Sequence, residues 1–257
     1  MQDEPKILEK NAQELLLGGK FQQAYESFED AAQIYRNQGS HKESALCFAS
    51  AASSWALKSG EEAFYNSARA YQDAAHEAEA AHDLEYASLL YRYAAISYER
   101  DMEFINYSEC FYASKECFRK FLLLSLFIPG KVFRISANKE KRRRAGWKMI
   151  FELITLTFSS LLWGYGERPA RAFFTAIFLV FLTALFYTQG QLARGEAVFN
   201  PTFFEAFYFS AVTFTTVGFG DITPVGFNKL IVIIEAFCGL FVIPVFIIGL
   251  SRKYLRV

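Results

Sequence analysis

The chain has 257 residues, of which 53% are hydrophobic, 18% aromatic and 21% charged. This composition is too apolar for a disordered protein and too charged for a bundle of membrane helices alone. Basic and acidic residues both number 27, but residues 1–120 carry 12 basic and 20 acidic, residues 121–147 carry 7 and 1, and the remainder carries 8 and 6. The sequence therefore predicts an acidic soluble half and a lipid-embedded half, joined by a basic segment.

Several functional classes are excluded by the motifs. The sequence contains no P-loop, GxGxxG or GxSxG element, so it predicts no nucleotide site, no hydrolase and no catalytic or cofactor-binding residue. No histidine lies at zinc-ligand spacing from a cysteine, and the first ten residues do not resemble a signal peptide. The four cysteines lack CxxC spacing and predict reduced, packed thiols: Cys47, Cys110, Cys117 and Cys238.

A repeated pattern in the first half predicts paired helices. No proline occurs between Pro5 and Pro129, which permits long helices. Alanine pairs recur at intervals of 20, 23 and 20 residues, each preceded three positions earlier by an aromatic residue. The pairs are Ala31–Ala32, Ala51–Ala52, Ala74–Ala75 and Ala94–Ala95. Since positions three and four apart share one helix face, we expect five helices, at about residues 20–37, 41–57, 61–79, 83–99 and 102–119.

The register of this repeat resembles tetratricopeptide repeats, and more closely the variant found in SNAP adaptors. The residues that carry the resemblance in the first unit are Ala24, Phe28, Ala31, Ala32 and Tyr35, and the resemblance extends over about residues 15–118. It implies an α-solenoid whose concave face binds a protein or small-molecule ligand. A module that only assists assembly fits the same pattern.

The segment 131–148 is strongly basic. Its cations are Lys131, Arg134, Lys139, Lys141, Arg142, Arg143, Arg144 and Lys148. Such a run beside apolar segments is typical of contact with the anionic cytoplasmic leaflet. A nucleic-acid-binding arm is the competing interpretation, and the neighbouring membrane segments favour lipid over nucleic acid.

Residues 147–163 predict an amphipathic helix that lies in the membrane interface. The polar residues form one stripe at steps of four, three and four: Lys148, Glu152, Thr155 and Ser159. If this helix crossed the membrane, the cluster Arg142–Arg144 and the pair Arg168 and Arg171 would lie on opposite sides. A helix lying flat keeps both on the cytoplasmic side, as the positive-inside rule favours.

Two later segments, Ala172–Tyr187 and Leu230–Leu250, are apolar enough to cross a bilayer, which takes about 20 residues. Basic residues flank the start of the first and the end of the second, so we expect both termini in the cytoplasm and a cell-membrane location. The second segment contains one acid, Glu235, which is costly there unless it has a partner. Neither segment has arginine at every third position, so we expect no voltage sensor of the usual kind.

The loop between these spans contains the most specific motif. Pro201 precedes a short apolar helix, Thr202–Phe214, which leads into Thr215-Thr216-Val217-Gly218-Phe219-Gly220-Asp221. This arrangement strongly resembles the pore helix and selectivity filter of two-transmembrane-helix potassium channels, over about residues 164–256. The common filter has a tyrosine where this chain has Phe219, although the phenylalanine form also occurs in that family.

The resemblance implies that potassium, the permeant ion, is coordinated by Thr216, Val217, Gly218, Phe219 and Gly220. Backbone carbonyls face one axis only where left- and right-handed conformations alternate, which Gly218 and Gly220 adopt at low cost. Asp221 at the outer mouth and Tyr208 on the pore helix are expected to support this filter. One filter segment cannot surround an ion, so the resemblance implies a homotetramer in a lipid bilayer.

Gly239 and Pro244 interrupt the second span, and we expect one of them to form a gate or hinge. Close helix packing at Gly239 is an equally good interpretation. The apolar run Phe121–Ile128 either caps the helical repeats or touches the membrane.

The sequence thus predicts an all-α protein in three parts: a cytosolic helical-repeat domain at 1–130, a basic linker and interfacial helix at 131–166, and a pore domain at 167–257. The predicted function is potassium-selective conduction, regulated through the N-terminal domain. The alternatives are a membrane-anchored adaptor and a non-selective cation channel.

Overall fold

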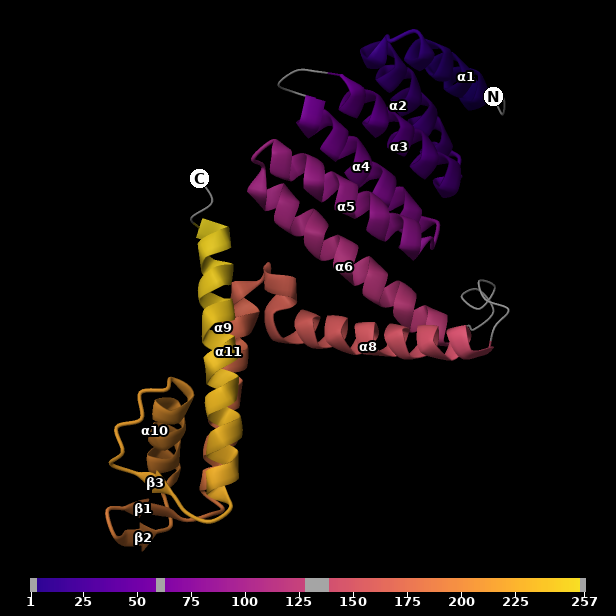
Figure 1. The fold of residues 1–257 in the computed structure, drawn as a ribbon. Helices are drawn as coiled ribbons and strands as arrows, with labels where there is room; N and C mark the ends of the chain where they lie inside the picture. Colours follow the sequence, from indigo (N-terminus) through magenta and orange to yellow (C-terminus); the bar gives the residue numbers. More distant parts are fainter. Residues whose placement is uncertain (1–3, 59–62, 128–138, 255–257) are drawn as a thin grey trace. The chain divides into compact units, whose positions relative to one another are not determined.

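The computed structural model describes residues 4–58, 63–127 and 139–254, and it is mainly helical (Figure 1). The chain divides into two compact units, Met1–Thr157 and Phe158–Val257. The helices agree with the expected all-α class at a coarse level, and a small three-stranded sheet in the second unit was not predicted.

In the described residues of the first unit, the helices before α8 (Lys139–Trp163) pack in chain order, each mainly on the next (Figure 1). They are α1 (Glu4–Leu17), α2 (Phe21–Asn37), α3 (His41–Leu57), α4 (Ala63–Ala80), α5 (Leu84–Arg100) and α6 (Phe104–Phe127). We call this array the helical stack. The sequence pattern did not predict α1, because α1 has no alanine pair and buries only Pro5 and Ala12.

The alanine pairs form the centre of the helical stack. All eight paired alanines are at most 1% exposed, and Phe28, Phe48 and Tyr91 are buried beside them. Small side chains let neighbouring helices approach closely, and the aromatic rings fill the space between the contacts. Buried hydroxyls add bonds between successive helices, since Ser44 donates to the carbonyl oxygen of Ala32 at 2.9 Å. The predicted apolar face of the repeat is therefore the buried face.

The run Phe121–Ile128 mostly belongs to the end of α6, which extends eight residues beyond the predicted boundary at 119. Leu122 and Ser125 are buried, whereas Leu124 is 51% exposed. The described part of the run thus has one face packed and one face exposed, and Ile128 lies outside the described residues.

Three of the cysteines are core residues of the helical stack. Cys47, Cys110 and Cys117 are buried and free. Burial raises the pKa of the Cys110 and Cys117 thiols to about 12, so both are protonated and weakly nucleophilic at neutral pH.

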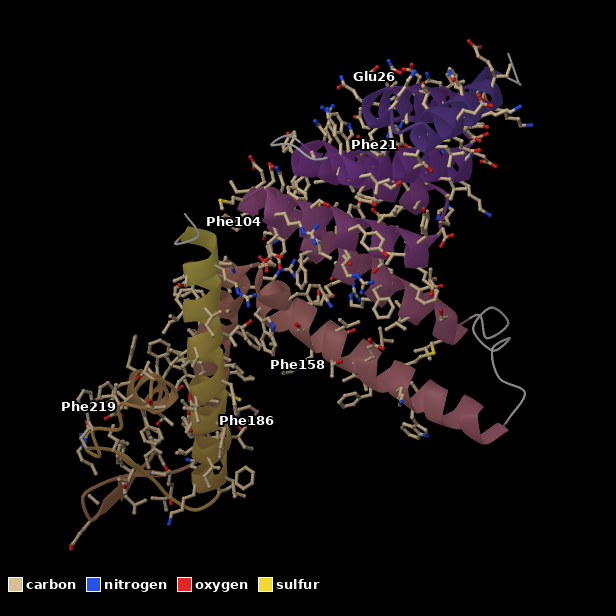
Figure 2. The ribbon with its side chains drawn as sticks, turned by 45° about the horizontal axis from the view of Figure 1, so that its top comes forward. Phe21, Glu26, Phe104, Phe158, Phe186 and Phe219 are labelled. Atoms are coloured by element: carbon tan, nitrogen blue, oxygen red, sulfur yellow. The ribbon has the colours of Figure 1, made fainter. Side chains whose placement is uncertain are left out.

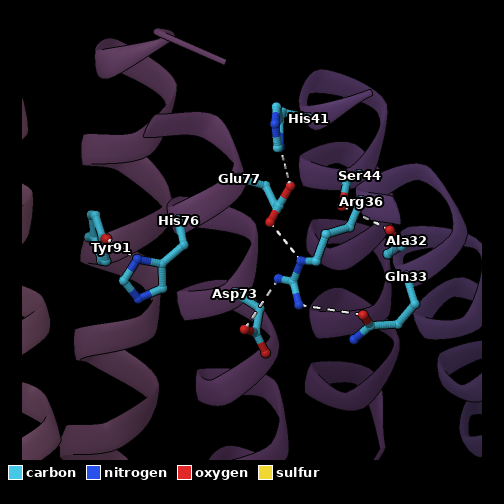
Figure 3. Close-up of polar contacts among 9 residues, drawn as sticks. All are labelled: Ala32, Gln33, Arg36, His41, Ser44, Asp73, His76, Glu77 and Tyr91. Carbon is cyan, nitrogen blue, oxygen red and sulfur yellow. Dashed lines mark hydrogen bonds and ion pairs between the residues drawn. The ribbon is translucent and has the colours of Figure 1, made fainter. Parts of the chain in front are cut away.

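A polar cluster connects α2, α3 and α4 of the helical stack (Figure 3). The buried Glu77 accepts a hydrogen bond from Arg36 Nε at 2.7 Å, and His41 Nδ1 lies 2.9 Å from its second oxygen. Arg36 also lies 3.5 Å from Asp73 and over the ring of Phe48. Burial alone would raise the pKa of the Glu77 carboxyl, but the hydrogen bonds from His41 and Arg36 and the charge of Arg36 outweigh it and lower the pKa.

Glu77→Gln should destabilise α2–α4 by about 2 kcal/mol at pH 7, because Arg36 loses a charged hydrogen-bond partner. Since the pKa of Glu77 is lowered by folding, its contribution is present above the ordinary carboxyl pKa and is lost as the pH falls through the lowered value. Hydrogen exchange of α2–α4 in the full-length protein would measure both effects. Glu26→Gln, at an exposed position of α2 (Figure 2), is the control and should change little. A Glu77 variant as stable as the control at neutral pH would contradict this account.

The second unit has three helices in mutual contact. They are α9 (Pro169–Tyr187), α10 (Phe203–Phe214) and α11 (Asn228–Tyr254). The strands β1 (Leu192–Arg194), β2 (Ala197–Phe199) and β3 (Thr223–Pro224) form an antiparallel sheet in the order β2-β1-β3. Leu192 pairs with Phe199 on one side and Pro224 on the other, so the sheet joins the segments before and after α10.

Helix α8 (Lys139–Trp163) crosses the boundary between the units, and the turn η2 (Gly164–Gly166) follows it. Within the described residues, three helices are long and apolar enough to cross a membrane: Gly146–Gly166, Pro169–Tyr187 and Asn228–Arg252. The first is the least apolar, and its five most exposed large apolar residues follow steps of four and three: Trp147, Phe151, Ile154, Phe158 and Leu161, with Ile150 exposed beside them. That stripe favours a helix in the interface, which stays a prediction.

Candidate functional site

The helix α10 lies in the loop between the two later candidate spans. Its first turn is closed by a capping box, in which Thr202 Oγ1 accepts from the Glu205 amide and the Glu205 carboxylate accepts from the Thr202 amide at 3.0 Å. Arg194 of β1 lies 3.2 Å from the Glu205 carboxylate. With 12 residues, α10 is too short to cross a bilayer.

The segment after α10 alternates in backbone handedness. Thr216, Gly218 and Gly220 have φ values of 57°, 55° and 78°, while the residues between them do not share the left-handed region. Glycine adopts this conformation readily, but threonine does so only where its surroundings require it. The amides of Val217 and Gly218 both donate to the carbonyl oxygen of Val212, at 3.1 and 3.3 Å. The alternation that the motif requires is therefore present in the backbone.

The side chains of this segment are exposed in the single chain. Val217 is 54% exposed and Phe219 is 69% exposed (Figure 2). Tyr208 of α10 donates a hydrogen bond to Asp221 Oδ2 at 3.0 Å, which joins α10 to the last residue of the segment. The residues Thr215–Asp221 thus form a surface segment that is held to α10 by backbone bonds and, at its two ends, by the side chains of Thr215 and Asp221.

Gly239 of α11 lies directly against the carboxyl end of α10. A Cβ atom at this position would overlap the carbonyl oxygen of Phe214. Val242 and Phe214 pack together in the same core, beside Val180 of α9. The contact gives a physical reason for glycine at 239 that involves no bending of the helix.

Gly239→Ala should destabilise the second unit by about 3 kcal/mol, because the added methyl group must displace the backbone of α10. Hydrogen exchange of α10 would measure the loss. Gly146→Ala is the matched control, since Gly146 lies in α8 with nothing within 4 Å of an added Cβ, and there alanine should favour the helix. Equal behaviour of the two variants would show that the contact with Phe214 is unimportant.

Pro244 lies five residues further along the same helix, inside α11. Proline has no amide hydrogen to donate, so one helical hydrogen bond is missing at this level and the helix bends more readily. Of the two hinge candidates, Gly239 is held by packing and Pro244 weakens the helix.

The turn between α8 and α9, which the sequence motifs did not single out, contacts the end of α11. Gly164, Tyr165 and Gly166 all have positive φ values. Glu167 is buried, and its Oε1 lies 3.7 Å from Arg252 Nη1 of α11. A Cβ atom at Gly249 would lie 3.2 Å from the Cβ of Pro169. We call Gly164–Glu167 the elbow.

Bonds within the second unit also join the end of α8 to α9. Arg171 Nη1 donates to the carbonyl oxygen of Ser160 at 2.7 Å, and Thr175 Oγ1 donates to that of Leu162 at 3.0 Å. The end of α8, the elbow and the start of α9 are thus connected by side chains as well as by the chain itself.

Comparison with known proteins identifies the segment that contains this site. Residues 173–255, about a third of the chain, match a family model described as "Ion channel". The "Hyperpolarization-activated voltage-gated potassium channel" of Methanocaldococcus jannaschii is 42% identical over 79 residues, 29% of this chain and 36% of that protein. The "Voltage-gated potassium channel Kch" of Escherichia coli is 41% identical over 80 residues, 30% of this chain and 18% of that protein. No solved structure matches the chain.

The chain thus spans well under two thirds of the length of either relative. The matched part is an ion-channel segment similar to that of potassium channels, and its apolar helices agree with a membrane protein. Channels move ions without changing covalent bonds, so these relatives support a function that is not enzymatic.

Proposed function

We propose that four copies of this chain form a potassium-selective channel that conducts K⁺ down its gradient across the cell membrane. The observation that carries the proposal is the alternating backbone of Thr216, Gly218 and Gly220 at the end of a short helix, inside a segment similar to potassium channels. A dehydrated ion needs rings of oxygen atoms, and backbone carbonyls supply them without a charged side chain.

The ion would be coordinated by the backbone of Thr216, Val217, Gly218, Phe219 and Gly220, with the Thr216 hydroxyl closing the inner site. Asp221 would lie at the outer mouth, held by its hydrogen bond from Tyr208. The carboxyl end of α10 carries the negative end of a helix dipole, which favours a cation beside it.

The single chain supports assembly into a homotetramer. Four filter segments are needed to surround one ion. The described chain also exposes apolar side chains that copies and lipid would cover, including Val217 and Phe219 in the filter segment and, along α11, Leu230, Ile233, Ile234, Phe237, Leu240, Phe241, Ile247 and Ile248.

Gly218→Asp should abolish potassium flux from liposomes that contain the purified full-length protein, because a side chain at this left-handed position distorts the filter. Gly195→Asp is the matched control: Gly195 has a φ of 61° in the turn between β1 and β2, outside the filter, with nothing within 4 Å of an added Cβ. The control should retain the flux.

The same assay separates the alternatives. Equal sodium and potassium flux in the wild type would identify a non-selective cation channel. No flux, together with a protein partner that co-purifies in fixed ratio, would identify a membrane-anchored adaptor. Loss of flux in both variants would mean that the assay reports protein damage rather than the filter.

We further propose that the helical stack, as a tetratricopeptide- or SNAP-like solenoid in the cytoplasm, regulates the channel by binding a protein or small-molecule ligand. A groove of about 700 Å³ in the first unit supports a binding role, and its lining includes Lys42, Leu46, Tyr86, Arg92 and Phe118 of the stack and Glu152 of α8. Both chain ends are proposed to be cytoplasmic, with α8 in the interface.

The elbow offers a route from α8 to the conducting unit. Its Glu167 lies beside Arg252 near the end of α11, and Gly249 packs on Pro169. A displacement of α8 would therefore be transmitted to α11 through these contacts, without involving the filter.

Deletion of residues 1–130 should change the open probability by about fivefold or more, since coupling between sites is commonly worth this much. If the elbow transmits the effect, the same deletion should change the open probability of Glu167→Gln by less than about twofold. Single-channel recording in planar bilayers measures both, with the exposed Glu196→Gln as control. An unchanged open probability on deletion in the wild type would refute regulation by the helical stack.

A further inference from the structure

A buried acid lies in the helices behind the filter segment. Glu235 of α11 is 2% exposed, although it belongs to a helix apolar enough to cross a membrane. Among the described residues, no lysine or arginine forms an ion pair with it. A buried carboxyl group without hydrogen-bond partners would destabilise the fold, so its contacts define what it does.

Three hydroxyl groups from two other helices converge on this carboxylate. Thr183 Oγ1 of α9 and Ser210 Oγ of α10 donate to Oε1 at 2.6 and 2.5 Å, and the Tyr187 hydroxyl of α9 donates to Oε2 at 2.6 Å. Thr183 and Tyr187 are four residues apart and so share one face of α9. Glu235 is thus the point at which α9, α10 and α11 are hydrogen-bonded together.

The three hydroxyls differ in whether they have a hydrogen-bond acceptor other than Glu235. Each hydroxyl carries one proton, and Thr183 and Ser210 have alternative acceptors for it, the carbonyl oxygens of Leu179 and Val180, both at 2.9 Å. Within the described residues, the buried Tyr187 hydroxyl bonds to Glu235 alone. Two of the three hydroxyls thus have a hydrogen-bond acceptor without Glu235. The role of Glu235 is therefore more than to accept hydrogen bonds from otherwise unpaired hydroxyls of α9 and α10.

A second contact between α10 and α11 lies four residues further along both helices than the contact between Glu235 and Ser210. Glu235 bonds to Ser210, and Gly239, four residues later, touches Phe214, also four residues later. Two contacts one turn apart on both helices fix their relative translation as well as their distance. The filter segment begins with the next residues of the chain, Thr215 and Thr216.

We infer that Glu235 is a positioning residue for the filter. By bonding Ser210 on one side and Thr183 and Tyr187 on the other, it holds α10 at the place from which the filter starts. It acts through α10 and touches no ion. The inference rests on the proposed potassium channel.

The test compares single-site variants of the full-length protein in planar bilayers, with the K⁺/Na⁺ permeability ratio measured from reversal potentials. The variants are Glu235→Gln, Ser210→Ala, Thr183→Val and Tyr187→Phe. Thr188→Val is the matched control, because Thr188 directly follows the last residue of α9, Tyr187, and within the described residues its hydroxyl donates to the carbonyl oxygen of Leu185, at 2.8 Å, and not to Glu235.

The ratio should fall by about tenfold or more in Glu235→Gln, as expected when several buried hydrogen bonds are disturbed at once. It should fall less in the three donor variants and stay within about twofold of the wild type in the control. Ratios that stay at the wild-type value in every variant that assembles would overturn the inference. So would failure of all four to form tetramers while the control does, since Glu235 would then be a folding residue only.

A second measurement separates positioning from general stability. Potassium bound in the filter should stabilise the tetramer, so thermal unfolding in KCl and in NaCl should differ. Misplacement of the filter should reduce that difference, whereas a purely structural defect should lower both midpoints equally and overturn the inference. A wild-type protein without potassium-selective flux would instead refute the proposed function, and the inference with it.

Discussion

The close approach of α11 to the carboxyl end of α10 is the contact on which the second unit depends. It requires that position 239 have no side chain, because the carbonyl oxygen of Phe214 occupies the space of a Cβ atom. Once the helices are this close, the acid one turn earlier reaches Ser210, and through its other partners it reaches α9. The absence of a side chain at Gly239 and the buried carboxyl group of Glu235 together determine where the filter segment begins.

The sequence predicted the parts of the molecule that local patterns determine. The alanine pairs gave the buried face of four helices, and the filter motif gave the positions that need left-handed backbone at Gly218 and Gly220. It did not predict α1, which lacks the repeat, or the left-handed Thr216, whose conformation no residue preference favours. The partners of Glu235 were also beyond prediction, since Thr183 and Ser210 lie 52 and 25 residues away and carry no motif.

The two units differ in the charged groups that join their helices. In the helical stack, alanines pack at the centre, and charged groups such as Arg36 of α2 and the buried Glu77 of α4 connect the helices. In the second unit, where the outer surfaces of α9 and α11 are apolar, hydroxyl groups supply the polar contacts inside. Hydroxyls suit that environment because they bond to a carboxylate without adding a second charge to be desolvated.

These contacts also attach the two halves of α11 to different parts of the second unit, so that the halves can move relative to each other. Glu235 and Gly239 attach its first half to α10, and Gly249 and Arg252 lie against the start of α9 and the elbow. Pro244 lies midway between these attachments, where one helical hydrogen bond is missing. A displacement of the elbow would move the last turns of α11 while the first half stays bonded to α10, so the strain would fall on the residues around Pro244. In the proposed channel, the gate can therefore bend at Pro244 while the carboxyl end of α10, and with it the filter, stays in place.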